Sequence, residues 1–132
     1  MSALRVLLAE DDPLARETIV EMLELEGFVM IPAVDGAEAL EIASRQMIDV
    51  LVTDIQMPRL MGDALVRRLR AVRPDLPIVV ITGFASESAF RAIKSVDGVP
   101  PEIIPKPFDM GYLAQAIRDA TRGNAHCLAE CD

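Results

Sequence analysis

The chain has no excess of basic residues and no long hydrophobic run, and each absence excludes a class of protein. Lysine and arginine total 13 against 21 acidic residues, which gives a net charge of -8. Nucleic-acid binding requires a basic face for phosphate contacts. No stretch approaches the roughly 18 apolar residues of a membrane span, and no charged and then apolar leader opens the chain. The sequence therefore predicts a soluble, cytoplasmic protein that binds neither nucleic acid nor membrane.

Cysteine is also scarce. The two cysteines, Cys127 and Cys131, both lie in the last few residues, a position that argues against the disulfide framework of a small secreted protein. With His126 they suggest a metal site only if this end of the chain is helical. The sequence favours incidental thiols in a C-terminal tail.

What the chain does contain is an alternation of two kinds of segment, which suits one domain of 132 residues with 52% apolar content. Apolar runs predict strands near residues 4–9, 28–31, 49–53, 78–82 and 103–104. Helical periodicity follows each run, starting near residues 13, 37, 63, 86 and 109. The alternation predicts an α/β fold with a five-stranded parallel sheet, doubly wound by helices on both faces.

Local signals also predict where elements end and which side chains face the core. Asp12 and Pro13 predict a capped helix start, whereas Pro32 and Pro105 are expected to follow strands. The inward faces are predicted to include Leu14 and Met22 on the first helix, Met47 on the second, and Leu65, Leu69 and Val72 on the third. Arg67, Arg68 and Arg70 are expected to lie mostly outside.

Polar residues stand at or just beyond the ends of four predicted strands. Asp54 ends the run Val50-Leu51-Val52-Thr53, Glu10 and Asp11 follow the first strand, Thr82 ends the fourth, and Lys106 follows the last. Right-handed crossovers place the carboxyl ends of parallel strands along one edge, where ligands bind in such sheets. We therefore expect these side chains to meet.

The three acids of this edge predict a cation site. Two unit charges about 4 Å apart repel by about 4 kcal/mol at an effective dielectric near 20, so the cluster must be neutralised or bind a cation. Hard oxygen donors favour Mg²⁺. Beside a metal, Asp54 suits a nucleophile toward a phosphoryl group, and Lys106 and Thr82 suit its negative charge. The alternative is structural: a helix cap at Asp11, a surface lysine and a β-forming threonine.

With their neighbours, these residues resemble the receiver domain of two-component response regulators, along the chain to about residue 122. The matching motifs are Val6–Pro13, Thr53–Pro58 with Gly62 beyond, Ile78–Gly83 and Pro105–Phe108, in the family's order and spacing. The resemblance implies a flavodoxin-like (βα)5 fold. It also implies that Asp54 accepts a phosphoryl group from a histidine kinase or a phosphotransfer protein.

The resemblance further implies roles around Asp54. Asp11 would ligate Mg²⁺ directly, Glu10 directly or through water, and the backbone carbonyl of Gln56 would complete the protein ligands. Thr82 and Lys106 would contact the phosphoryl group. One departure is Ile103, which stands where a switch tyrosine or phenylalanine often lies. Phe84 is expected to flank the path of the hydrolytic water, with Gln56 opposite, and so to influence the lifetime of the phosphoryl group.

We thus expect a stand-alone receiver domain at residues 1–122 with a tail at 123–132. It would be no enzyme beyond its own phosphorylation and dephosphorylation, and would signal by altered contacts with an unknown downstream protein, as a monomer or a phosphorylation-dependent homodimer. One alternative is a receiver module of a hybrid histidine kinase or longer regulator. An alternative of another class is an aspartyl-phosphate-forming phosphatase, although such enzymes often carry a second acid where Gln56 stands.

Overall fold

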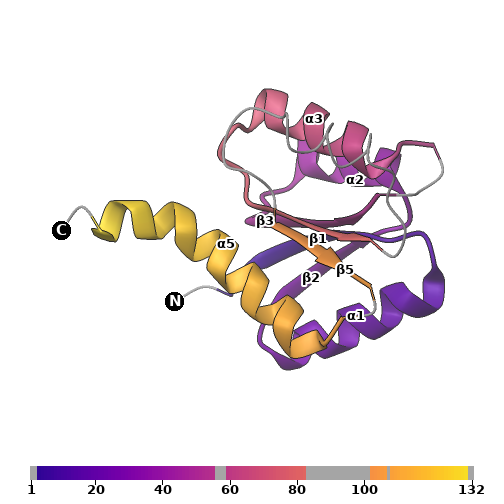
Figure 1. The fold of residues 1–132 in the computed structure, drawn as a ribbon. Coiled ribbons are helices and arrows are strands. Elements are labelled where there is room, and N and C mark those ends of the chain that lie inside the picture. Colours follow the sequence, from indigo (N-terminus) through magenta and orange to yellow (C-terminus); the bar gives the residue numbers. More distant parts are fainter. Residues whose placement is uncertain (1–2, 56–58, 83–101, 107, 131–132) are drawn as a thin grey trace.

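The computed structural model describes residues 3–55, 59–82, 102–106 and 108–130. In this part of the chain, five strands form one parallel sheet in the order β2-β1-β3-β4-β5. The strands are β1 (Arg5–Ala9), β2 (Val29–Ala33), β3 (Val50–Asp54), β4 (Ile78–Thr82) and β5 (Glu102–Pro105). The sheet confirms the predicted α/β, flavodoxin-like fold (Figure 1).

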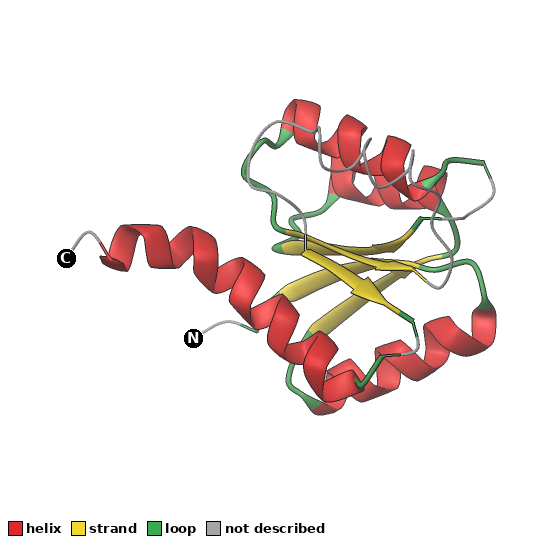
Figure 2. Cartoon of the chain, in the orientation of Figure 1, coloured by secondary structure: helices red, strands yellow, loops and turns green. Residues whose placement is uncertain are grey.

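Helices cover both faces of the sheet. The helices of the described residues are α1 (Pro13–Leu25), α2 (Gly36–Arg45), α3 (Gly62–Val72) and α5 (Met110–Glu130). Figure 2 shows α1 and α5 on one face and α2 and α3 on the other. The helix predicted to start near residue 86 lies outside the described residues.

The core consists of two apolar layers, one on each face of the sheet. Leu7 and Leu51 point into the layer under α2 and α3, whereas Leu8 and Val52 point into the layer under α1 and α5, and all four are fully buried. Burial on both faces is the reason that these strands are continuous apolar runs instead of alternating ones. The two layers hold the carboxyl ends of β1, β3 and β4 side by side.

The inward face of α3 differs from the prediction. The buried side of this helix includes Leu65, Val66 and Leu69. It also includes Arg70, which is only 4% exposed, but not Val72, which is 73% exposed. Arg70 Nε donates a hydrogen bond to the carbonyl of Leu76, 2.9 Å away, in the turn that follows the helix. The arginine therefore closes the end of the core where an apolar residue was predicted.

Three other apolar side chains were also wrongly predicted to face inward. Leu14 and Met22 of α1 are exposed, because the buried stripe of this helix centres on Ile19 and Leu23. Met47 is exposed because α2 ends at Arg45, before the turn that would have directed this side chain toward the sheet.

The predicted ends of two strands were too early. Pro32 and Pro105 lie within β2 and β5, paired with Leu8 and Thr82 in the register. Both are edge strands of this sheet, and a proline is tolerated there because its missing N–H can face away from the neighbouring strand.

Local sequence signals mark the start of α1 but not the end of α5. Asp12 caps α1 as predicted, its side chain accepting a hydrogen bond from the N–H of Leu14. Helix α5 continues past Gly123 to Glu130, beyond the sheet (Figure 1), where the sequence pattern fades. The division into a domain at 1–122 and a tail at 123–132 stays a prediction. No helix of the described part is long and apolar enough to cross a membrane.

Candidate functional site

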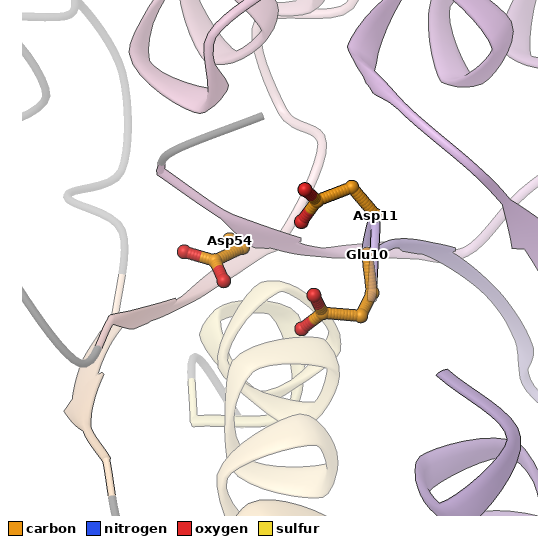
Figure 3. A group of neighbouring side chains, drawn as sticks. All are labelled: Glu10, Asp11 and Asp54. Carbon is orange, nitrogen blue, oxygen red and sulfur yellow. The ribbon is translucent and has the colours of Figure 1, made fainter. Parts of the chain in front are cut away.

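The structure brings three carboxylates together at the carboxyl edge of the sheet. Strands β1 and β3 are paired with Ala9 opposite Thr53, so the residues that follow, Glu10 and Asp54, are neighbours. Asp11 comes next after Glu10, and one oxygen from each of the three side chains lies within 4.8 Å of the others (Figure 3). The cluster thus forms from residues of two strand ends, as the parallel topology requires.

Glu10 is the buried member of this cluster, with 1% of its side chain exposed. The N–H of Asp12 donates to Glu10 Oε2 at 3.1 Å, and Arg16 donates from its guanidinium to the Glu10 carbonyl at 2.9 Å. Burial raises the pKa of Glu10 above its ordinary 4.5, against the opposing effects of the Asp12 N–H and of Lys106. The sequence gives one signal for the Arg16 contact, which is its position one helical turn after the capping Asp12.

Lys106 supplies the positive charge of the site. Its Nζ lies 2.8 Å from Asp54 Oδ2 and 3.4 Å from Glu10 Oε1, and its backbone N–H donates to the carbonyl of Thr82 at 2.7 Å. Burial lowers the pKa of this lysine, but the hydrogen bond to Asp54 and the two nearby carboxylates outweigh burial, so the net pKa is raised. The lysine is therefore an ammonium ion held against both acids.

Thr82 lies on the strand next to Asp54. In the register of β3 and β4, Asp54 is opposite Ile81, so Thr82 stands one residue further toward the site. Its hydroxyl oxygen is buried and has no hydrogen-bond partner among the described residues. A buried hydroxyl without a partner loses its hydration at a free-energy cost, and it can donate to a group that arrives at Asp54.

The remaining predicted residues are only partly placed. Ile103 lies in β5 opposite Val80 and packs, partly buried, against the core layer under α2 and α3. Gln56 and Phe84 lie outside the described residues. The roles of all three in metal binding, switching or lifetime stay predictions.

The donors of the cluster fit a hard divalent cation. Three carboxylates from Glu10, Asp11 and Asp54 converge, with Asp11 exposed and Asp54 partly buried, so the group is open to solvent on one side. Carboxylate and carbonyl oxygens with retained waters are the usual Mg²⁺ environment. In the structure Lys106 balances part of this charge.

A doubly wound five-stranded sheet with acids and a lysine at its carboxyl edge defines a class, the CheY-like receiver domains. A family model described as the response regulator receiver domain matches residues 6–118. The chain belongs to this family, whose members are the receiver domains of two-component systems.

Curated relatives of this chain include the response regulators MprA of two mycobacteria. The protein of Mycobacterium leprae is 38% identical over 119 residues, which are 90% of this chain and 51% of the relative. That of Mycobacterium ulcerans is 36% identical over 120 residues, which are 91% of this chain and 51% of the relative. The chain spans about half the length of these relatives.

Solved structures agree on the fold. The chemotaxis protein CheY4 of Vibrio cholerae is similar with a TM-score of 0.82 and 26% identity, covering 90% of this chain and 99% of that structure. A CheY-like receiver domain protein of Methanospirillum hungatei has a TM-score of 0.89, covering 95% of this chain and 98% of that structure. Its identity of 22% supports the fold alone.

Proposed function

We propose that the chain is a phosphoacceptor of a two-component or phosphorelay system, and that Asp54 takes the phosphoryl group from a phosphohistidine. The observation that carries this proposal is the position of the Asp54 carboxylate, 2.8 Å from the Lys106 ammonium and clustered with Glu10 and Asp11. The phosphohistidine would belong to a histidine kinase or to a phosphotransfer protein, as membership of the response regulator family suggests.

The transfer is a substitution at phosphorus. A carboxylate oxygen of Asp54 forms a bond to phosphorus while the P–N bond of the phosphohistidine breaks, and the electron pair leaves with the imidazole nitrogen. The Lys106 ammonium stabilises the negative charge first on the Asp54 carboxylate and then on the phosphoryl oxygens. The buried Thr82 hydroxyl donates a hydrogen bond to one of those oxygens. Positioning and charge stabilisation supply most of the catalysis in such transfers.

Glu10, Asp11 and Asp54 would hold Mg²⁺, with the backbone carbonyl of Gln56 as a further predicted ligand outside the described residues. The ion would supply positive charge beside the transferring oxygens. Support comes from the convergence of three hard oxygen donors within 4.8 Å. Burial of Glu10 gives a further reason, because an ionised buried carboxylate gains from a nearby cation.

The output is a change of contact with another protein, through the face made by the helix predicted near residue 86, β5 and α5, which Thr82 and Lys106 border. The half-length match to longer regulators shows that the matching region occurs within longer proteins. A stand-alone receiver and a module of a longer regulator or hybrid kinase make the same prediction for Asp54.

The test is phosphorylation by acetyl phosphate with Mg²⁺, followed by intact mass. The protein should gain the mass of one phosphoryl group, and Asp54→Asn should gain none. Asp12→Asn is the matched control, because asparagine is an equally good helix cap, and it should be labelled like the natural chain. Full labelling of Asp54→Asn would refute the assignment. Repeated turnover of p-nitrophenyl phosphate would support the phosphatase alternative instead.

A further inference from the structure

Arg59 has a backbone conformation that a residue with a side chain rarely adopts. Its φ is 68°, in the left-handed region, and it is the one non-glycine residue of the described part with a positive φ. This region is disfavoured because Cβ approaches the neighbouring carbonyl. Such strain persists only where the surroundings compensate for it, so other contacts of Arg59 must stabilise this conformation.

The compensation comes from Asp35, 24 residues earlier in the chain. Arg59 Nε donates to Asp35 Oδ2 at 2.6 Å, and a terminal nitrogen donates to Oδ1 at 3.0 Å, the two-pronged geometry of the strongest arginine–carboxylate pairs. The Asp35 side chain is 7% exposed and that of Arg59 is 63% exposed. Asp35 Oδ1 also caps α2 by accepting from the Glu38 N–H at 2.8 Å, so the carboxylate is fixed from two sides.

Two glycines extend this contact to Asp54. A Cβ on Gly36 would collide with the carbonyl of Leu60, and a Cβ on Gly62 would collide with the carbonyl of Asp54. The N–H of Gly62 also donates to the Ile55 carbonyl at 2.7 Å. Residues 59–62 therefore lie between the start of α2 and the backbone of the predicted phosphoacceptor, in close contact with both.

From these contacts we propose that Arg59 and Asp35 form a clamp that positions the Asp54 backbone, so that its carboxylate faces Glu10 and Asp11. Arg59 is then a positioning residue for metal binding and phosphoryl transfer, although it touches neither group itself. The inference rests on the proposed function of Asp54 and deepens it. The competing explanation is that the ion pair contributes to stability alone.

Arg59→Gly separates the two explanations. Glycine adopts a positive φ without strain, so this variant loses the clamp and the strain at once, and its melting temperature should stay close to that of the natural chain. Its Mg²⁺ affinity, measured by titration calorimetry, and its labelling rate with acetyl phosphate should each fall about tenfold, as removal of groups that orient metal ligands commonly costs.

Three further variants complete the test. Arg59→Ala keeps the strain, so it should melt lower than Arg59→Gly while its Mg²⁺ affinity falls by the same factor. The double variant Asp35→Asn, Arg59→Gly should lose no more Mg²⁺ affinity than either change alone, because both changes remove the same contact. Arg45→Ala removes the exposed pair with Glu41 and should leave both readouts unchanged. It is the matched control for loss of an arginine.

Wild-type Mg²⁺ affinity and labelling rate in Arg59→Gly would overturn the clamp. Equal falls in Arg45→Ala would also overturn it, because the effect would then follow net charge. If the natural chain takes up no phosphoryl group, the proposed function fails, and the clamp is judged by Mg²⁺ affinity alone. All rates and affinities are compared at a temperature at which every variant is folded.

Discussion

The Nζ of Lys106 lies 2.8 Å from Oδ2 of Asp54, although the two residues are 52 positions apart in the chain. The same ammonium lies 3.4 Å from Glu10 Oε1. One cation thus bridges the ends of β1 and β3, and this bridge has consequences for stability and for metal binding.

Lys106→Met should destabilise the protein in the absence of Mg²⁺. The change keeps the apolar stem but leaves Asp54 and Glu10 without their ammonium, and a lost hydrogen bond to a charged group costs about 1–3 kcal/mol. Added Mg²⁺ should recover more of the free energy of unfolding in this variant than in the natural chain, because it binds only the native state. Urea unfolding with and without Mg²⁺ measures both values. An equal Mg²⁺ response in the two proteins would contradict the role of Lys106.

Thr82→Val should leave the unphosphorylated protein at least as stable as before. The variant replaces a buried hydroxyl that has no partner among the described residues by a methyl group of similar shape, which removes a desolvation cost. The phosphorylated form should instead lose stability relative to the natural chain. Thermal melts with and without beryllofluoride, a phosphoryl mimic, compare the two states. A lower melting temperature of the unphosphorylated variant would show that the hydroxyl already has a stabilising contact.

The Asp35–Arg59 pair should make stability depend on pH in acid. The hydrogen bond from Arg59 lowers the pKa of Asp35 below its ordinary 3.8, and burial opposes this only in part. A carboxyl group with a lowered folded pKa stabilises the protein at pH values above its unfolded pKa, and this stability is lost as the pH falls through the folded pKa. Asp35→Asn should therefore be less stable than the natural chain near neutral pH.

The difference in unfolding free energy between these two proteins should shrink as the pH falls below about 3.8, since protonated Asp35 no longer attracts Arg59. Urea unfolding of both proteins at a series of pH values, from neutral to below about 3.8, measures this difference. No difference between the two proteins at any pH would mean that the cap to Glu38, which asparagine retains, accounts for the stabilising effect of Asp35. A difference that stays constant with pH would mean that the charge of Asp35 is not its cause.

Truncation of the polar Arg70 should lower the free energy of unfolding more than truncation of the apolar Val72. Arg70→Ala removes a buried stem and the hydrogen bond to the Leu76 carbonyl and should cost about 1–3 kcal/mol of unfolding free energy. Val72→Ala changes an exposed side chain and should cost less than about 0.5 kcal/mol. Urea unfolding of both variants checks the order. A larger loss for Val72→Ala than for Arg70→Ala would contradict the inward position of Arg70 and favour the face that periodicity predicts for α3.

The local sequence determined much of the fold. Apolar runs long enough to be buried on both faces mark strands such as Ile78–Thr82, and the cap at Asp12 starts α1 where it was predicted. Because parallel strands with right-handed crossovers end at one edge, the meeting of Glu10, Asp11, Asp54 and Lys106 also follows from their place after strands.

The tertiary structure alone decided three other features. Periodicity could not show that α3 turns Arg70 inward, because this depends on the Leu76 carbonyl, in the turn after the helix, that receives its hydrogen bond. The edge positions that admit Pro32 and Pro105 into strands depend on the strand order. The left-handed backbone of Arg59 depends on Asp35, which no local rule connects with it. For the prolines and for Arg59 the deciding energy comes from contacts between segments far apart in the chain, and for Arg70 it comes from the turn after its helix. Local propensity contains none of these contacts.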